Sequence, residues 1–208
     1  MNALAELINY ISTTLVGVYT LLILLRFVFQ WAKADFFNPI SQGIVTATTP
    51  TLKPFRRFIP GFAGLDVAAL ALALLFNFFG VVLTAFLAGI GAHIISALPA
   101  LFACALLKVM ATLINIASFC LIVGIILSFV APMSNNPAAI LVQQVSGFIS
   151  SPFRKIMPDL GPIDISPIFV FLAIGVFIRL LSIIGAQFDV SVSSVWLFAI
   201  VGFPTTIF

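Results

Sequence analysis

Two pairs of basic residues stand at matching places in this sequence and are its clearest candidates for binding chemistry. Arg56 and Arg57 lie in the stretch PFRRFIP, and Arg154 and Lys155 lie in the similar stretch PFRKIMP. An arginine fork holds a phosphate or carboxylate through two hydrogen bonds, and each basic charge near an anionic leaflet contributes about 1 kcal/mol of attraction. We interpret these residues as sites for lipid or partner binding, or as charges that only fix the topology.

An aspartate follows each basic pair. Asp66 comes ten residues after Arg56, and Asp164 comes ten residues after Arg154. Each aspartate stands where an apolar run begins, so we expect its carboxylate to cap a helix and oppose the positive end of the helix dipole. The alternative is an ion-binding site or a salt-bridged pair with the nearby arginines.

Four polar residues within the apolar runs are candidates for special roles. Arg26 lies near the end of the first run and is expected to extend to the interface. Arg179 lies deeper, where a charge costs a few kcal/mol unless it reaches the headgroups or a partner, so it either extends outward or has a function. Asn77 and Asn115 are expected to hydrogen-bond between helices or to line a polar path.

Enzymatic chemistry finds little support in the residues present. The chain has one histidine, and its two cysteines, Cys104 and Cys120, stand in apolar sequence without metal-ligand spacing. No general acid and base, metal-ligand set or glycine-rich phosphate loop can be assembled, so we expect no enzyme, cofactor or metal. The net charge of +3 is too dispersed to predict nucleic-acid binding.

The elements that must position these residues are membrane-spanning helices. Of the 208 residues 62% are apolar and 7% are charged, whereas soluble domains have about 25% charged residues. Because a span needs about 20 apolar residues, the sequence predicts an all-α membrane protein with four spans. These are expected at about residues 7–31, 67–89, 105–130 and 165–186. The third should follow Pro99, and the C-terminal tail should lie at the interface.

The sequence also contains an internal repeat. A shift of 98 residues places Asn38, Pro39, Pro54, Pro60 and Asp66 on Asn136, Pro137, Pro152, Pro158 and Asp164. One register held over this distance indicates a duplication, with units at residues 1–98 and 99–208. Each unit has a span, a basic segment and a second span, so the two units are predicted to be parallel repeats.

The basic segments, at about residues 38–60 and 136–158, are predicted to be amphipathic helices. Asn38 and Asn136 can cap them, and the proline that follows each asparagine suits the first turn. In the second segment apolar residues recur at spacings of three and four, which is typical of a helix lying on a leaflet. We expect Pro50 and Pro152 to end the two helices.

Charge sets the expected orientation. Lysine and arginine gather in the connections after the first and third spans and are absent from the N-terminus, the residue 89–99 turn and the tail. The positive-inside rule therefore places both basic connections in the cytoplasm and both termini outside it.

These motifs resemble a known family. NPISQ at residues 38–42, Thr49-Pro50, PFRRFIP and Gly64-Leu65-Asp66 are similar to the repeat of the YggT family, called YlmG in Gram-positive bacteria and plastids. PFRKIMP and GPIDISP resemble the second repeat of that family, and the two copies cover almost the whole chain. The resemblance implies a bacterial inner-membrane protein. It also implies links to osmotic tolerance and cation homeostasis in proteobacteria, or to division and cytochrome assembly in other lineages.

Two hypotheses about function follow. The first is a membrane-embedded accessory or scaffold protein, whose basic segments bind anionic lipids and an envelope or division protein at the inner leaflet. The second is a channel or a subunit of an ion-homeostasis system, as a homo-oligomer because four spans rarely enclose a wide pore. The scaffold is favoured, because a cation path should show acidic side chains or broken spans in the membrane.

Overall fold

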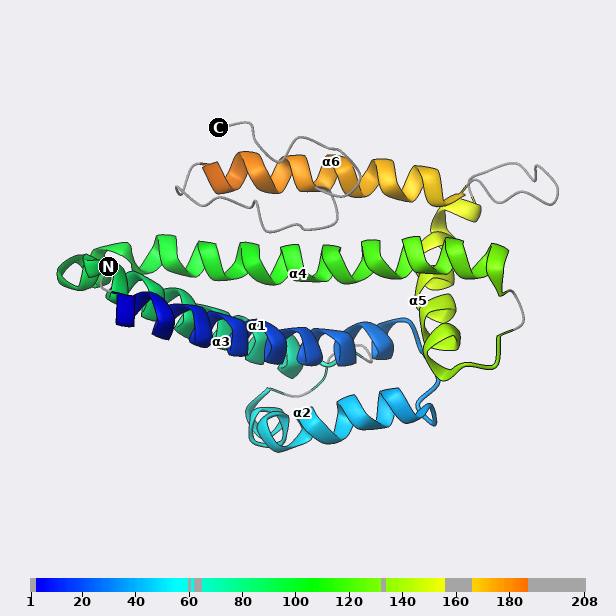
Figure 1. The fold of residues 1–208 in the computed structure, drawn as a ribbon, viewed down its shortest axis with the longest axis horizontal. Coiled ribbons are helices and arrows are strands. Elements are labelled where there is room, and N and C mark those ends of the chain that lie inside the picture. The colour runs from blue at the N-terminus through cyan, green and yellow to red at the C-terminus, as the bar shows by residue number, and fades with distance from the viewer. Residues whose placement is uncertain (1–2, 60, 62–64, 132–133, 156–165, 187–208) are drawn as a thin grey trace.

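The computed structural model describes residues 3–59, 61, 65–131, 134–155 and 166–186, and all the regular elements within these ranges are helices. In chain order they are α1 (Ala3–Trp31), α2 (Pro39–Phe58), α3 (Val67–Ala85), η1 (Phe86–Ile90), η2 (Gly91–His93), α4 (Ile94–Val130), α5 (Pro137–Arg154) and α6 (Ser166–Ala186). Figure 1 shows α1, α3, α4 and α6 running lengthwise, with α5 crossing near one end. Pro60, Pro158, Asp164 and the C-terminal tail lie outside the described residues.

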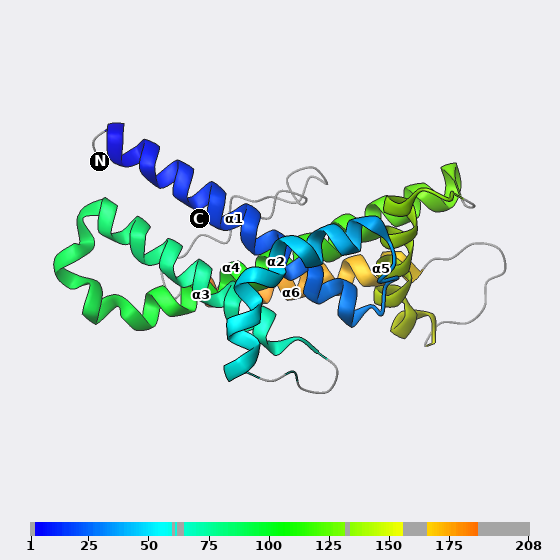
Figure 2. The same ribbon diagram turned by 90° about the horizontal axis from the view of Figure 1, so that it is seen from below.

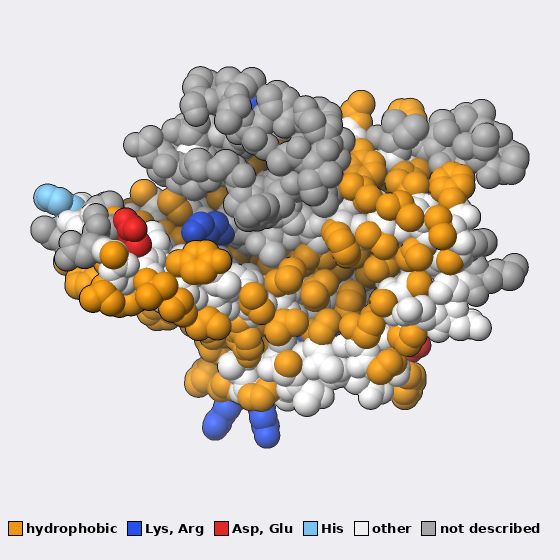
Figure 3. Space-filling model, viewed as in Figure 1, with side chains coloured by type: hydrophobic (Ala, Val, Ile, Leu, Met, Phe, Trp, Pro, Cys, Tyr) orange, Lys and Arg blue, Asp and Glu red, His pale blue; other side chains and the backbone are white. Residues whose placement is uncertain are grey.

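Three helical stretches are long and apolar enough to cross a membrane. They are α1, residues Val67–Gly89 and α4, with 29, 23 and 37 residues. Helix α6 contributes a shorter apolar stretch, Phe169–Gly185. Hydrophobic side chains are spread widely over the described part of the face in Figure 3, as expected where a surface meets lipid instead of water. Because a helix satisfies its own backbone hydrogen bonds, such stretches can enter a bilayer.

Gly89 marks the reversal of the chain between α3 and α4. Its φ of +88° lies in the left-handed region, which glycine adopts without a steric cost. The expected start of the third span after Pro99 is wrong, because α4 begins at Ile94 and contains Pro99. A proline this near the start of a long helix removes one backbone hydrogen bond and leaves the following turns intact.

Helices α2 and α5 begin in the same way. The Asn38 side chain accepts a hydrogen bond from the Ile40 N–H at 3.0 Å, and Asn136 accepts one from the Ala138 N–H at 2.9 Å. A proline follows each asparagine at the first position of the helix. The backbone N–H of that position has no partner within the helix, so proline, which lacks an N–H, loses no hydrogen bond there. Residues next to each other in the sequence therefore determine where both helices start.

The expected helix ends at Pro50 and Pro152 are wrong. Helix α2 continues to Phe58 and α5 continues to Arg154, with these prolines inside them. Figure 2 shows that α2 changes direction along its length, which a proline inside a helix allows. Beyond Pro50, Leu52 is fully buried against the other helices, and this packing favours continuation of the helix.

The main hydrophobic core joins the first five α-helices. Its buried members are Ile23, Leu24, Phe27, Val28, Leu52, Ala68, Ala69, Leu72, Ala73, Val109, Ile116, Cys120 and Val145. Helix α6 packs on α4 through a smaller cluster formed by Leu107, Ile114 and Leu181. Most of the buried residues of the main core belong to α1 and α3, and the candidate site lies where these two helices meet α2.

Candidate functional site

Arg26 of α1 is buried against α2. Its side chain is 9% exposed, and Nη1 donates to the Thr48 hydroxyl at 2.9 Å, the Thr49 hydroxyl at 3.1 Å and the Val45 carbonyl at 3.2 Å. The expectation that Arg26 extends to the interface is wrong, because α2 covers the guanidinium and supplies hydrogen-bond acceptors for it. A buried charge requires such partners.

Asp66 joins this cluster from the start of α3. Its carboxylate accepts a hydrogen bond from Arg56 Nη2 and stands 3.9 Å from Arg26 Nε, with 3% of the side chain exposed. The capping expectation is wrong for the side chain, which makes no cap hydrogen bond. The carboxylate contacts two arginines instead of the backbone N–H groups at the start of α3. The cluster of Arg26, Arg56 and Asp66 connects α1, α2 and α3. We call this cluster the arginine node.

Two further basic residues of α2 face outward. Lys53 and Arg57 are exposed, and neither has a hydrogen bond or ion pair with another described residue. The Arg56 side chain is 44% exposed although it contacts Asp66. In Figure 3 Lys and Arg side chains project from the edge formed by α2. This edge therefore carries positive charge that the described part of the protein does not neutralise.

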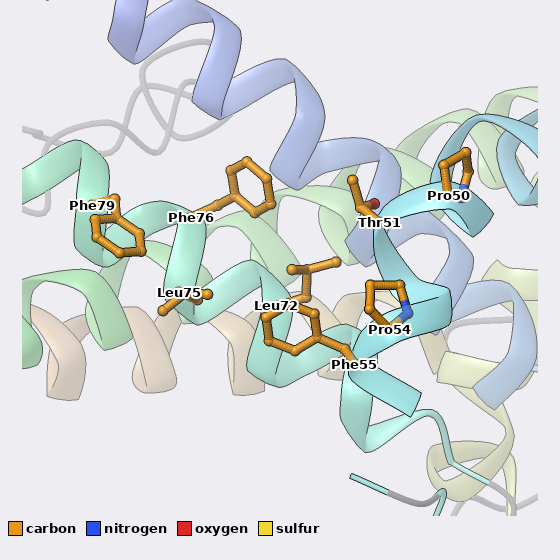
Figure 4. Close-up of a pocket in the computed structure, with 8 residues that line it drawn as sticks. All are labelled: Pro50, Thr51, Pro54, Phe55, Leu72, Leu75, Phe76 and Phe79. Atoms are coloured by element: carbon orange, nitrogen blue, oxygen red, sulfur yellow. The ribbon is translucent and has the colours of Figure 1, made fainter. Parts of the chain in front are cut away.

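An apolar groove of about 400 Å³ lies between α2 and α3. Figure 4 shows the side chains that line it: Pro50, Thr51, Pro54 and Phe55 from α2, and Leu72, Leu75, Phe76 and Phe79 from α3. Tyr19 of α1 supports it, because its hydroxyl hydrogen-bonds Thr51 and its ring stands 5.2 Å from that of Phe76. Three helices thus shape one apolar surface.

The second basic pair lies on α5 in a different environment. Arg154 and Lys155 are both exposed, at the C-terminal end of that helix. The position equivalent to Arg26 is Gly124, and a Cβ atom there would come within 2.4 Å of the Ser146 hydroxyl oxygen. Helices α4 and α5 therefore pack in direct contact at Gly124, whereas the Arg26 side chain lies between α1 and α2.

The two motif regions contact each other. The Asn38 amide donates to the Pro137 carbonyl at 2.8 Å, and the Asp35 N–H donates to the Gln144 side chain at 2.9 Å. Phe148 of α5 packs edge-on against the ring of Trp31, at a centroid distance of 5.4 Å. A hydrogen bond thus joins the starts of α2 and α5, and the end of α1 and the connection after it contact the middle of α5.

The polar residues within the apolar helices have three different environments. Asn77 of α3 donates to the Thr20 hydroxyl of α1 at 3.1 Å and to the Ala73 carbonyl at 2.9 Å. Asn115 of α4 has a buried Oδ1 that meets no donor among the described residues. The side chain of Arg179 is exposed on α6. Of these three residues, only Asn77 makes a hydrogen bond between helices within the described part of the chain.

The arrangement is suited to holding anions. Within the described ranges no three His, Cys, Asp or Glu side chains gather into a possible metal site. The exposed groups at the α2 edge are cationic donors beside an apolar groove. Sequence reasoning did not assign Lys53 or Arg26 to the site. The signal available for Arg26 was the isolated aspartate at the start of the next apolar run, since two buried opposite charges usually pair.

Long apolar helices joined by short polar helices define a helical, membrane-type protein. The sequence profile of the CCB3/YggT family matches residues 1–87 and 103–185, so the chain belongs to the CCB3/YggT family. No solved structure matches it.

Relatives of the chain occur in several bacteria. A Pseudomonas aeruginosa protein described as uncharacterized protein PA0392 is 46% identical over 165 residues, 79% of this chain and 83% of that protein. The YggT protein of Escherichia coli K12 is 30% identical over 79% of this chain and 84% of its own length. A Vibrio alginolyticus protein described by its place in the proC 3' region is 32% identical over 84% and 90%.

Proposed function

We propose that this chain is a non-enzymatic accessory or scaffold protein of the bacterial inner membrane. Its four spans form two parallel repeats, and the amphipathic helices α2 and α5 lie at the cytoplasmic leaflet with both termini outside the cytoplasm. Basic residues at the ends of these helices bind anionic lipid or an envelope or division protein. The distribution of lysine and arginine along the sequence supports this orientation.

The observation that carries the proposal is the way in which the arginine node fixes α2. Arg26 donates to two threonine hydroxyls of α2, and Asp66 holds Arg56 of the same helix. A docking surface needs a rigid frame, because ordering flexible side chains and segments on binding reduces affinity. The node supplies this frame, while Lys53 and Arg57 stay exposed on the outer surface of α2.

Co-purification tests the scaffold function. The protein is extracted in mild detergent and compared with a variant in which Arg57, Arg154 and Lys155 are changed to Gln, leaving Arg56 in place because it contacts Asp66. We expect a partner protein at constant ratio with the unaltered chain and its loss from the variant. Lys33→Gln, which removes another exposed charge from the chain, is the matched control. The absence of any partner at constant ratio would contradict the proposal.

One observation favours a transport function as the second candidate. Asn115 Oδ1 and Ser118 Oγ stand one turn apart on α4, and both atoms are buried without a hydrogen-bond partner among the described residues. Unpaired polar atoms in an apolar helix are costly unless water, an ion or another subunit reaches them. Because both atoms are buried within the chain, water or an ion would have to enter between the helices to reach them, and such a path would serve osmotic or cation homeostasis.

Ion flux separates the two candidates. Potassium and sodium flux is measured in liposomes containing purified protein, an Asn115→Leu variant or no protein. Cation-selective flux that depends on protein and is altered by the variant would replace the scaffold proposal with transport. Flux equal to that of empty vesicles, from protein shown to be folded, is the result expected of a scaffold.

A further inference from the structure

We propose that the groove between α2 and α3 binds one anionic phospholipid, with an acyl chain along α3 and the headgroup phosphate at Lys53 and Arg57. This inference rests on the proposed function, because it names the lipid that the basic residues of α2 would hold. The lipid is placed on the first half of the chain. Arg56 does not contact its phosphate, because Arg56 already donates a hydrogen bond to Asp66.

The shape of the groove fits an acyl chain. Its α3 wall is one helical stripe, in which Leu72, Leu75, Phe76 and Phe79 follow each other at spacings of three and four. Leu75 and Phe79 are 36% and 62% exposed, so the groove is open along its length. Figure 4 shows Leu72 and Phe76 pointing from α3 to the side on which α2 lies, with Leu75 and Phe79 farther along α3.

The charges lie where the headgroup would be. Lys53 and Arg57 are separated by one helical turn of α2, and they share a stripe with Pro50 and Pro54 of the groove wall. The Arg56 guanidinium is already engaged, because it contacts the buried Asp66 carboxylate at the start of α3. A phosphate at the end of the groove could therefore receive hydrogen bonds from Lys53 and Arg57 without disturbing the arginine node.

An anionic phospholipid matches this site better than a peptide does. The groove is apolar on both walls, and its one polar side chain, Thr51, is already hydrogen-bonded to Tyr19. A peptide backbone placed there would have carbonyl and N–H groups without partners, whereas an acyl chain has none to satisfy. Phosphatidylglycerol combines such chains with one negative charge, and phosphatidylethanolamine with the same chains carries no net charge.

The same arrangement does not recur at the equivalent positions of α5. Ser151 stands where Lys53 would be, and Ile149 and Gly147 stand where Thr51 and Thr49 would be, although Lys155 matches Arg57. One of the two phosphate donors is thus absent from the second copy. A stoichiometry of one tightly held lipid per chain follows from this difference.

Native mass spectrometry of the delipidated full chain tests the site. Phosphatidylglycerol or phosphatidylethanolamine with identical acyl chains is titrated into the protein, a Lys53→Gln/Arg57→Gln variant and an Arg154→Gln/Lys155→Gln control. Each charge near an anionic lipid strengthens binding about fivefold, so we expect the first variant to bind phosphatidylglycerol about 25-fold more weakly. The control should bind one phosphatidylglycerol as tightly as the unaltered chain.

A second pair of variants tests the groove without changing charge. Leu75→Trp fills the groove, and Leu83→Trp places the same ring on a site of α3 that is equally exposed, at 37%, and outside the groove. We expect Leu75→Trp to remove the one-lipid complex and Leu83→Trp to keep it. Melting temperatures measured in detergent confirm that all variants are folded.

Several results would overturn the lipid site. These are equal affinity for the two lipids, equal loss in the α5 control, or an unchanged complex in Leu75→Trp. If these occur while the Arg57, Arg154 and Lys155 variant still loses a partner protein, the lipid inference fails and the scaffold proposal stands. If lipid binds as expected but no partner is found, the scaffold proposal fails and the lipid site stands.

Discussion

Gly124 approaches Ser146 so closely that a Cβ atom at Gly124 would stand 2.7 Å from the Ser146 Cβ atom. The positions 98 residues earlier hold Arg26 and Thr48, whose side chains are joined by a hydrogen bond of 2.9 Å. Equivalent places in the two halves of the chain are therefore filled in opposite ways, by a buried arginine in one and by close contact between helices in the other. The two halves are not interchangeable.

The close contact predicts a large effect of a small substitution. Gly124→Ala should lower the free energy of unfolding by about 1 to 3 kcal/mol, because the added methyl group forces α4 and α5 apart. Gly147→Ala is the control, because a Cβ atom there meets nothing within 4 Å. Alanine suits a helix better than glycine, so the control should be neutral or slightly stabilising. Unfolding in SDS, followed by tryptophan fluorescence, measures both, and equal effects would refute the contact.

The arginine node predicts a graded series of substitutions. Arg26→Met leaves the buried Asp66 with a weaker set of partners and should cost about 3 to 5 kcal/mol in unfolding free energy. Arg56→Gln should cost less, about 1 to 3 kcal/mol, because the Arg56 side chain is 44% exposed but its loss removes the nearer partner of the buried Asp66 carboxylate. Arg57→Gln, which removes no described contact, is the reference. A cost for Arg56→Gln equal to that for Arg26→Met would show that burial of Arg26 does not matter.

The two motif asparagines should differ in importance. Both cap a helix, so Asn38→Ala and Asn136→Ala each lose about 1 kcal/mol from the cap. Asn38 also donates to the Pro137 carbonyl, so its substitution should cost about 1 kcal/mol more in unfolding free energy. The second substitution is an internal control for the first. Equal costs in the SDS titration would mean that the bond between α2 and α5 contributes nothing.

A hydrogen bond between helices in an apolar region predicts a modest effect. Asn77→Ala breaks the bond from α3 to Thr20 of α1 and should cost about 0.6 kcal/mol, and at most about 2 kcal/mol. Thr112→Ala is the matched control, because Thr112 donates only to the Lys108 carbonyl of its own helix. A cost above that range would require a role for Asn77 beyond this bond, such as a polar path.

Local features of the fold could be predicted from the sequence because their causes are local. The caps at Asn38 and Asn136, each followed by proline, depend on side chains one or two residues away. The long apolar stretches depend only on composition. These features do not depend on contacts with distant residues. The sequence therefore predicts where α2 and α5 start and that the chain contains membrane-type helices.

The candidate site was harder to predict, because it depends on contacts between distant residues. Arg26 has a length and charge that suit extension to the interface, and only the position of α2 over it makes burial favourable. Pro50 would end an isolated helix, but burial of Leu52 beyond it supports continuation. The sequence allowed two kinds of partner for Asp66, a backbone N–H or an arginine. Asp66 pairs with Arg56 because the fold places that residue of α2 beside it.

The orientation of α2 at the cytoplasmic leaflet is the central claim, and cysteine labelling tests it most directly. Cys104 and Cys120 are first replaced by alanine, and single cysteines are introduced by Phe58→Cys, at a side chain 82% exposed, or by His93→Cys, at an exposed position of the turn between α3 and α4. A membrane-impermeant maleimide is then added to cells with a permeabilised outer membrane and to inverted inner-membrane vesicles. With α2 at the cytoplasmic leaflet, we expect the cysteine at position 93 to react only in cells and the one at position 58 only in vesicles. The reverse pattern would place α2 outside the cytoplasm and contradict the proposed orientation.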